Sequence, residues 1–292
     1  MKNLLNNPPA YIAFIAVVPC STTVIWVRLS DAPSLTVALW RMIFSTILCI
    51  PFLIIERREV KNLSPKNFLT CALSGFFLAL HFATWLSALT MTSAAAAASL
   101  VSTNPIFVAL ITAFWFHKKP SKTVIISLIF TIIGSVVVAF GSGFASLGSL
   151  SGNMLAVLGA LTVAFYLVIG SFVRKTVTSG IYVTIVFAFA AIFLALFCII
   201  LDAQLAPDNS QTFLAIFALA VFCSLGGHVV FNWLLKYHEP MLISIAVLFE
   251  PVFASIWALW LFEEVPSVLT VFGCIMIIGG VWYYIKSNER PS

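Results

Sequence analysis

Long apolar segments alternate with short polar breaks along the whole chain. Each segment is about as long as the roughly 20 residues that a helix needs to cross a bilayer. The breaks carry charged residues, prolines or glycines, which end helices and form turns. The pattern therefore predicts ten transmembrane helices. They run near residues 10–27, 33–55, 67–89, 94–116, 123–141, 153–172, 180–201, 211–235, 241–262 and 267–285.

The composition excludes a soluble domain. Apolar residues make up 62% of the 292 positions and charged residues 9%, against about 25% charged residues in an ordinary soluble protein. Disorder is excluded as well, because it requires low hydrophobicity and high charge, whereas the mean hydropathy is +1.11. The predicted fold class is an all-α polytopic membrane protein.

The basic residues favour one orientation of the chain. With the N-terminus in the cytoplasm, 13 of the 15 lysines and arginines face the cytoplasm, as the positive-inside rule requires. Arg28 then lies outside, and Arg41 lies within a span. The sequence predicts a protein of the inner (cytoplasmic) membrane with both termini in the cytoplasm. The 13 residues are Lys2, Arg57, Arg58, Lys61, Lys66, Lys118, Lys119, Lys122, Arg174, Lys175, Lys236, Lys286 and Arg290.

The two halves of the chain are related to each other. A shift of 146 residues, half the length of 292, places every predicted span on another span. The same shift places Pro105 on Pro251 and Arg28 on Arg174. The chain is therefore predicted to consist of two five-helix repeats, residues 1–146 and 147–292. They are joined by a stretch rich in glycine and serine, 141–152, that is typical of a flexible link.

An odd number of helices in each repeat turns one repeat upside down relative to the other. The loop charges agree with this arrangement, because the loop 57–66 has four basic residues and its equivalent, 202–213, has none. Inverted repeats are characteristic of secondary transporters, whose substrate sites form near the bilayer midplane between the halves. The pattern predicts a 5+5 inverted repeat.

Several motifs in both halves carry a family resemblance. They are residues 38–41, 81–89, 92–109, 227–233, 248–251 and 262–266. Taken together they resemble the drug/metabolite transporter superfamily, in its EamA branch. The resemblance covers nearly the whole chain. It implies ten helices in a 5+5 inverted arrangement and alternating access, and its known members mostly export amino acids or other small metabolites.

Two prolines, Pro105 and Pro251, lie near the centres of the fourth and ninth predicted spans. A proline in a helix leaves a carbonyl about one turn earlier without its donor. In a bilayer that carbonyl needs a partner from protein, water or substrate. Because the two prolines are equivalent in the repeat, we expect a pair of kinked helices that line a central cavity. Passive kinks are the alternative.

Arg41 and Glu250 are the clearest ionisable residues deep inside predicted spans. A charge at this depth is costly and tends to face a cavity or a partner. Glu250 is a candidate for binding an amine or a proton, and Arg41 for binding a carboxylate. The alternatives are a structural ion pair, or an Arg41 side chain that snorkels to the outer face.

Polar and aromatic residues at helical spacing add to the candidate site. His81 and Trp85 are four residues apart, and so are His228 and Asn232, so each pair shares one helix face. Such groups at membrane depth turn inward, where they either contact a ligand or form interhelical hydrogen bonds and packing. Two further candidates for the cavity are Asn104 and Tyr166.

Motifs for other chemistry are missing from the sequence. There is no HExxH, P-loop or nucleotide fingerprint, and no His or Cys cluster with the spacing of metal ligands. The six cysteines lie in apolar stretches and are interpreted as small apolar residues. The basic residues are scattered rather than gathered into a patch for nucleic acid. We therefore expect no cofactor, no metal and no nucleic-acid partner.

These observations predict a secondary transporter, not an enzyme, that moves a small-molecule substrate such as an amino acid out of the cell. Without a nucleotide site, transport has to run on a gradient of substrate, counter-substrate or protons. One alternative is a membrane protein that binds a ligand without moving it. A membrane-embedded enzyme is less favoured, because the polar residues are spread over several helices. The oligomeric state stays open.

Overall fold

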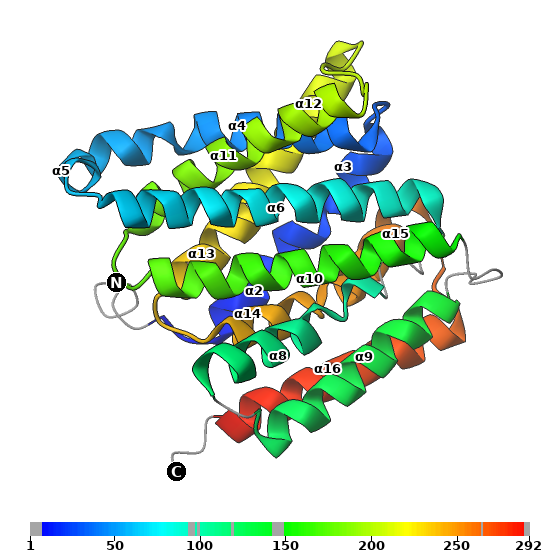
Figure 1. The fold of residues 1–292 in the computed structure, drawn as a ribbon. Coiled ribbons are helices and arrows are strands. Elements are labelled where there is room, and N and C mark those ends of the chain that lie inside the picture. Colours follow the sequence, from blue (N-terminus) through cyan, green and yellow to red (C-terminus); the bar gives the residue numbers. More distant parts are fainter. Residues whose placement is uncertain are drawn as a thin grey trace.

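The computed structural model describes residues 8–92, 97, 100–117, 120–141, 149–263 and 265–288. Every regular element among these residues is a helix (Figure 1). Most of the predicted link, 142–148, and with it the predicted repeat boundary, lies outside the described residues. The same holds for four of the predicted cytoplasmic residues, which are Lys2, Lys118, Lys119 and Arg290.

The helices follow the predicted spans along the chain. Up to residue 141 they are α2 (Tyr11–Ser21), α3 (Thr23–Leu29), α4 (Ser34–Ile55), α5 (Arg57–Lys61), α6 (Pro65–Met91), α8 (Asn104–Phe116) and α9 (Lys122–Gly141). From residue 150 they are α10 (Leu150–Val173), α11 (Ser179–Ile200), α12 (Ser210–Leu219), the π-helix η1 (Ala220–Val229), α13 (Val230–Leu234), α14 (Pro240–Val247), α15 (Glu250–Phe262) and α16 (Val268–Asn288).

Seven of these helical stretches are long and apolar enough to cross a membrane. Three shorter apolar stretches, Tyr11–Val27, Asn104–Trp115 and Lys122–Val138, lie at three further predicted spans. Large apolar side chains are exposed over the outer surface of the bundle, which is the arrangement that lipid requires and water disfavours. The chain is a multi-pass membrane protein.

Polar residues at the predicted breaks start the helices. Ser64 accepts a hydrogen bond from the backbone N–H of Asn67 at 3.2 Å and is followed by Pro65 in the first turn of α6. Ser149 caps α10 in the same way, with its Oγ 3.0 Å from the backbone nitrogen of Gly152. Each cap satisfies one of the backbone donors that a helix leaves unpaired at its N-terminus.

The 146-residue shift carries α8 onto α15 at both ends, because Asn104–Phe116 falls on Glu250–Phe262. A two-residue turn precedes each helix, at 102–103 and at 248–249. Each helix is followed by a residue in the left-handed conformation, His117 with φ 56° and Glu263 with φ 55°. The two segments therefore repeat the same backbone path over about sixteen residues.

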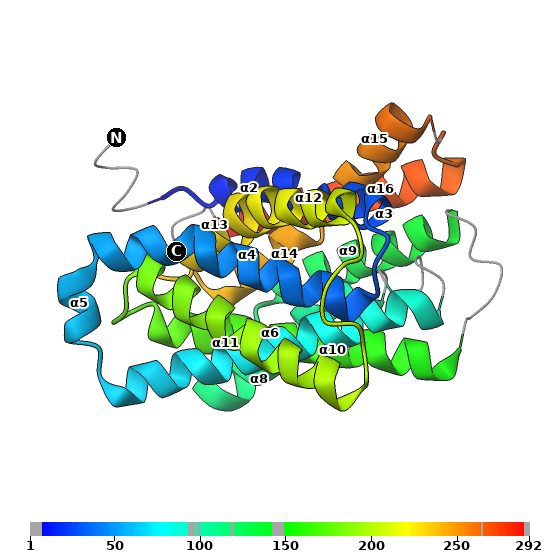
Figure 2. The ribbon, with the colours of Figure 1, turned by 90° about the horizontal axis from the view of Figure 1, so that it is seen from above.

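The same shift carries each pair of packed helices onto another pair of packed helices, or onto itself. α6 lies along α10, and the equivalents of these two helices, η1 and α2, pack together as well. α4 packs against α11 and α9 against α16, so that each of these pairs joins two equivalent helices (Figures 1 and 2). The core of the bundle is thus built from contacts between the halves of the chain.

Glycine permits the close approach of α9 and α16. A Cβ atom on Gly134 would lie 2.8 Å from the carbonyl oxygen of Gly273 and 2.9 Å from the Ile277 side chain. The equivalent position, Gly280, is equally crowded, because a Cβ there would lie 2.8 Å from Thr131. The shift carries Gly134 onto Gly280 and Thr131 onto Ile277, so the two contacts are equivalent. Small residues of this kind allow membrane helices to pack backbone against backbone.

Candidate functional site

Arg41 of α4 points into the bundle, and only 2% of its surface is exposed. Its Nε donates a hydrogen bond to Oγ of Ser224 on η1 at 3.1 Å. Its guanidinium carbon lies 4.6 Å from the centroid of the Phe82 ring on α6, where the ring face attracts a cation. A charge from the first half of the chain is therefore positioned by a hydroxyl from the second half.

Glu250 is the first residue of α15 and is only partly buried. Among the described residues its carboxylate forms no hydrogen bond and no ion pair, but Arg41 lies close enough to act on it electrostatically. The N-terminus of a helix also favours a negative charge. The site thus holds two opposite charges that interact without forming a closed ion pair.

His81 and Trp85 lie on one face of α6 and stack on each other, with ring centroids 5.9 Å apart and planes 2° from parallel. Nδ1 of His81 lies 2.9 Å from the carbonyl oxygen of Gly159 on α10. Next to them, the Phe82 ring meets the His228 ring at 5.9 Å. Phe82 and His228 are equivalent in the repeat, so their contact places this aromatic group between the halves of the chain.

Asn232 of α13 connects the end of η1 to α10. Its Nδ2 donates to the hydroxyl of Tyr166 at 2.5 Å and to the carbonyl oxygen of His228 at 2.7 Å. Arg174 donates from Nε to the backbone carbonyl of Asn232 at 2.8 Å. Asn232 and Tyr166 are both buried, so this network fixes the end of η1 against α10.

Two buried polar atoms of the predicted site have no hydrogen-bond partner among the described residues. They are Nε1 of Trp85, a donor, and Oδ1 of Asn232, an acceptor. Nearly all buried polar groups in proteins are satisfied by protein or by ordered water. Both atoms are therefore buried polar groups that this arrangement of the helices leaves unsatisfied.

The structure places Asn104 and the two prolines at the starts of helices. Asn104 accepts a hydrogen bond at Oδ1 from Ser244 of α14, so it joins the fourth and ninth spans. Pro105 lies in the first turn of α8 and Pro251 in the first turn of α15. Proline fits this position because its missing N–H has no helical partner there. The spans are interrupted just before the prolines rather than bent at them.

Ser224 and Phe82, which the sequence did not single out, belong to the core of the site. Ser224 is four residues before His228 on the same helix, which is a signal that could have been used. The contact of Phe82 with Arg41 joins distant parts of the chain, and no local spacing indicates it. No group of three His, Cys, Asp or Glu side chains in the described part of the chain could hold a metal ion.

The fold and these contacts define a class: a multi-pass helical membrane protein with a polar centre between two related halves. The model of the EamA-like transporter family matches residues 8–140 and again residues 150–285. The chain belongs to the EamA-like transporter family, which is part of the drug/metabolite transporter superfamily.

Curated relatives that match this chain are named uncharacterized transporters. An uncharacterized transporter of Archaeoglobus fulgidus is 28% identical over 212 residues, which are 72% of this chain and 73% of the relative. The uncharacterized transporter YdfC of Bacillus subtilis is 23% identical over 257 residues, 86% of this chain and 82% of the relative. A protein crystal structure with 18% sequence identity has the same fold, with a TM-score of 0.79 over 96% of this chain and 98% of that chain.

Proposed function

We propose that the protein is a secondary transporter that exports small zwitterionic metabolites, with amino acids as the first candidates. It works by alternating access in the inner membrane, with both termini in the cytoplasm. It has ten spans in a 5+5 inverted repeat, with residues 1–146 as one repeat and residues 147–292 as the other. Support for the repeat comes from the equivalent paths of α8 and α15 and from the helix pairs that exchange under the shift.

The observation that carries the proposal is the position of Arg41 and Glu250. The two charges come from different halves, interact at a distance, and leave Glu250 without a closed partner in the described chain. Keeping such charges away from water is costly unless they are compensated. A zwitterion compensates both, with its carboxylate at Arg41 and its ammonium group at Glu250.

The surrounding groups supply the remaining contacts. The orphan atoms of Trp85 and Asn232 offer one donor and one acceptor, and the rings of His81, Phe82 and His228 provide flat apolar walls. His81 and Glu250 are the candidates for a coupled proton. The turns before Pro105 and Pro251 are the hinges at which α8 and α15 change angle as access alternates.

The test is counterflow in proteoliposomes that contain the purified protein. A panel of radiolabelled amino acids, nucleosides and polyamines is offered to vesicles loaded with the same unlabelled compound. We expect accumulation of at least one amino acid and none in vesicles without protein. Accumulation confined to nucleosides or polyamines would overturn the substrate class.

Two other outcomes correspond to other functions. Binding of a panel compound without any flux would identify a ligand-binding protein that does not transport. Chemical conversion of the compound, detected by mass spectrometry of the vesicle contents, would identify a membrane-embedded enzyme. Either result would overturn the proposed transport.

A further inference from the structure

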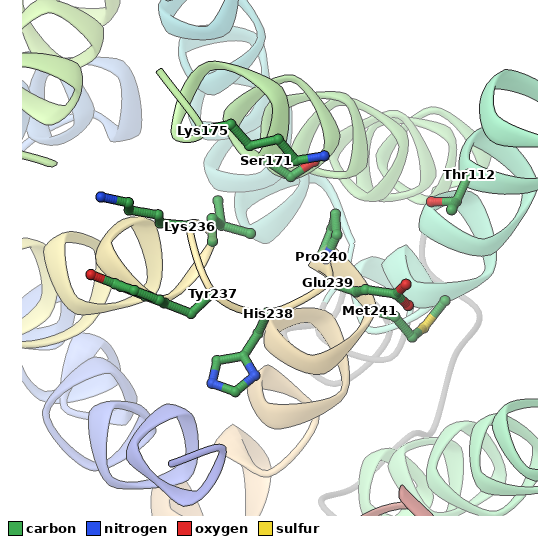
Figure 3. A pocket seen from close by; sticks show the side chains of 10 residues that line it. Thr112, Ser171, Lys175, Lys236, Tyr237, His238, Glu239, Pro240 and Met241 are labelled. Atoms are coloured by element: carbon green, nitrogen blue, oxygen red, sulfur yellow. The ribbon is translucent and has the colours of Figure 1, made fainter. Parts of the chain in front are cut away.

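A pocket of about 260 Å³ lies at the end of the bundle opposite the loop before α12, away from the central site. Figure 3 shows it between the end of α10, the turn that leads into α14, and α8. Its volume is slightly below the roughly 300–1,000 Å³ of pockets that hold drug-sized ligands. It is large enough for a small metabolite.

The pocket contains groups of both charges. The Lys175 side chain extends along one wall beside Ser171, and the Glu239 carboxylate points from the start of α14 toward Thr112 (Figure 3). No hydrogen bond or ion pair of the Lys175 amino group is found within the described chain. Lys236 also borders the pocket, but its amino group points away from it and lies 5.7 Å from the Tyr237 ring centroid.

An unsatisfied group lies on the wall opposite Lys175. Oγ1 of Thr112 is fully buried and has no hydrogen-bond partner among the described residues. In Figure 3 it points from α8 toward the interior of the pocket. Buried hydroxyls without a partner are rare in proteins, and a ligand or water in the pocket would satisfy this one.

We infer that this pocket is a loading site for the zwitterionic substrate, with the carboxylate bound by Lys175 and the ammonium group by Glu239. The inference rests on the proposed function for the identity of the ligand. Thr112 provides a neutral hydrogen bond between the two charges.

The pocket and the central site share one wall. α14 starts at the pocket with Pro240, contacts Asn104 through Ser244, and ends at Val247, three residues before Glu250. Its eight residues span about 12 Å at the 1.5 Å rise of an α-helix. A substrate released from Glu239 therefore has to pass the length of α14 to reach Glu250 at the start of α15.

In the sequence, the positions equivalent to these two charges in the first repeat are neutral. The repeat places Leu29 at the position of Lys175 and Ser93 at the position of Glu239. The charged pocket lies at the end with Lys175 and Lys236, which the distribution of basic residues assigns to the cytoplasm. Of these two pairs of equivalent positions, only the pair at the pocket therefore offers a zwitterion two charges, which is the arrangement an exporter uses to collect its substrate.

The experiment measures the charge and the occupancy of the pocket with thiol reagents. Met241, which borders the pocket, is changed to cysteine, and its labelling rates with anionic sulfonatoethyl methanethiosulfonate and a cationic trimethylammonium analogue are compared. The unsubstituted protein gives the background from its six native cysteines. We expect Lys175→Gln to slow the anionic reagent about threefold or more, because it removes a nearby positive charge. Lys236→Gln is the matched control and should change the rate less.

Occupancy is measured as protection by L-leucine. Millimolar leucine should slow labelling of Met241→Cys, and Lys175→Gln should abolish this protection. Equal effects of the two lysine variants, or absence of protection, would overturn the proposal. Protection by phosphatidylethanolamine but not by leucine or the other amino acids would assign the pocket to a lipid headgroup and overturn it too.

A second cysteine variant, Ser171→Cys on the α10 wall of the pocket, tests whether the result depends on the position of the cysteine at Met241. Failure of both cysteines to react would also overturn the proposal, because the pocket would then be closed to solutes. The labelling needs no transport. Protection without counterflow therefore supports the loading site and rejects the transport function. Counterflow without protection supports the transport function and rejects the loading site.

Discussion

The third and eighth predicted spans are equivalent in sequence position but differ in backbone. α6 is a continuous α-helix of 27 residues. Its equivalent is α12 followed by ten residues of π-helix in η1 and a short α13. π-helical turns usually occur singly and often lie at functional sites. A ten-residue run of them in only one of two equivalent spans marks that span as the specialised one.

The side chains differ in the same way as the backbone. Along the eighth span Ser224, His228 and Asn232 form polar contacts in the site. Their equivalents on α6 are all apolar: Leu78, Phe82 and Leu86. The repeat therefore builds a symmetric scaffold, and at these three pairs of equivalent positions the polar side chains lie only in the eighth span. This difference can be tested by changing each member of an equivalent pair.

The largest effect is expected from Arg41, whose equivalent is the buried Phe187. Arg41→Leu should lower counterflow of the best panel amino acid about 100-fold, because charge-assisted hydrogen bonds to the substrate are lost. Phe187→Leu removes a similar volume without removing a charge and should reduce flux only a few-fold. Initial rates are normalised to monodisperse protein. Equal losses in the two variants would mean that Arg41 acts through packing.

The next effect concerns the scaffold. Gly134→Ala should destabilise the protein by about 1–3 kcal/mol, because the new methyl group meets backbone atoms of α16 that cannot move aside. Gly280→Ala should cost a similar amount, since its contact is the equivalent one. Gly279, which has open space around a Cβ, is the control and should tolerate alanine. Thermal unfolding in detergent measures all three, and a stable Gly134→Ala variant would contradict the close packing of α9 on α16.

α8 and α15 follow the same backbone path but differ in charge at their first residue, which is the neutral Asn104 in α8 and Glu250 in α15. Glu250→Gln should raise the apparent KM for an amino acid about tenfold through loss of one ionic contact. If Glu250 carries a proton instead, the pH dependence of flux should flatten while counterflow survives. Glu250→Asn makes the two repeats alike and should behave as Glu250→Gln does. Wild-type flux at every pH in both variants would leave Glu250 with a packing role.

The smallest effect is expected from Ser224, which touches Arg41 rather than the substrate. Ser224→Ala removes the hydrogen bond from Nε of Arg41 and should raise KM about threefold to tenfold, since a typical intramolecular hydrogen bond contributes about 0.5–1.5 kcal/mol. Ser224→Thr retains the hydroxyl and should restore most of the affinity. Leu78→Ala at the equivalent position tests whether loss of volume alone has the same consequence. We expect Leu78→Ala to leave KM nearly unchanged. A rise in KM equal to that of Ser224→Ala would refute the positioning role of Ser224.

Much of the scaffold could be predicted from sequence because it depends on periodic signals. Hydropathy predicted apolar segments where the structure has helices, seven of them long enough to cross a membrane, and the 146-residue offset placed Pro105 on Pro251. The spacing of four residues also indicated that His81 and Trp85 share a helix face, where their rings stack. These properties are local, or they recur along the chain, so a single sequence contains them.

The features that the sequence did not indicate depend on long-range contacts or on small differences in backbone geometry. A π-helix and an α-helix bury similar apolar residues, so composition did not reveal η1. The hydrogen bond from Arg41 to Ser224 joins residues 183 positions apart. The interruptions before Pro105 and Pro251 were expected as kinks, because a proline near the middle of an apolar span is compatible with both a bend and a new helix start.

The pairing of α9 with α16 has a consequence for biogenesis. α9 packs mainly against α16, which follows more than 120 residues later in the chain. A ribosome delivers membrane helices in order of synthesis, so α9 enters the bilayer while its partner has not yet been made. The face of α9 that carries its glycines, Thr131 and Ser135 therefore stays uncovered in the membrane until α16 (Val268–Asn288) has been inserted. Assembly therefore finishes only with α16, and a nascent chain stalled before Val268 would present this uncovered face to membrane quality control.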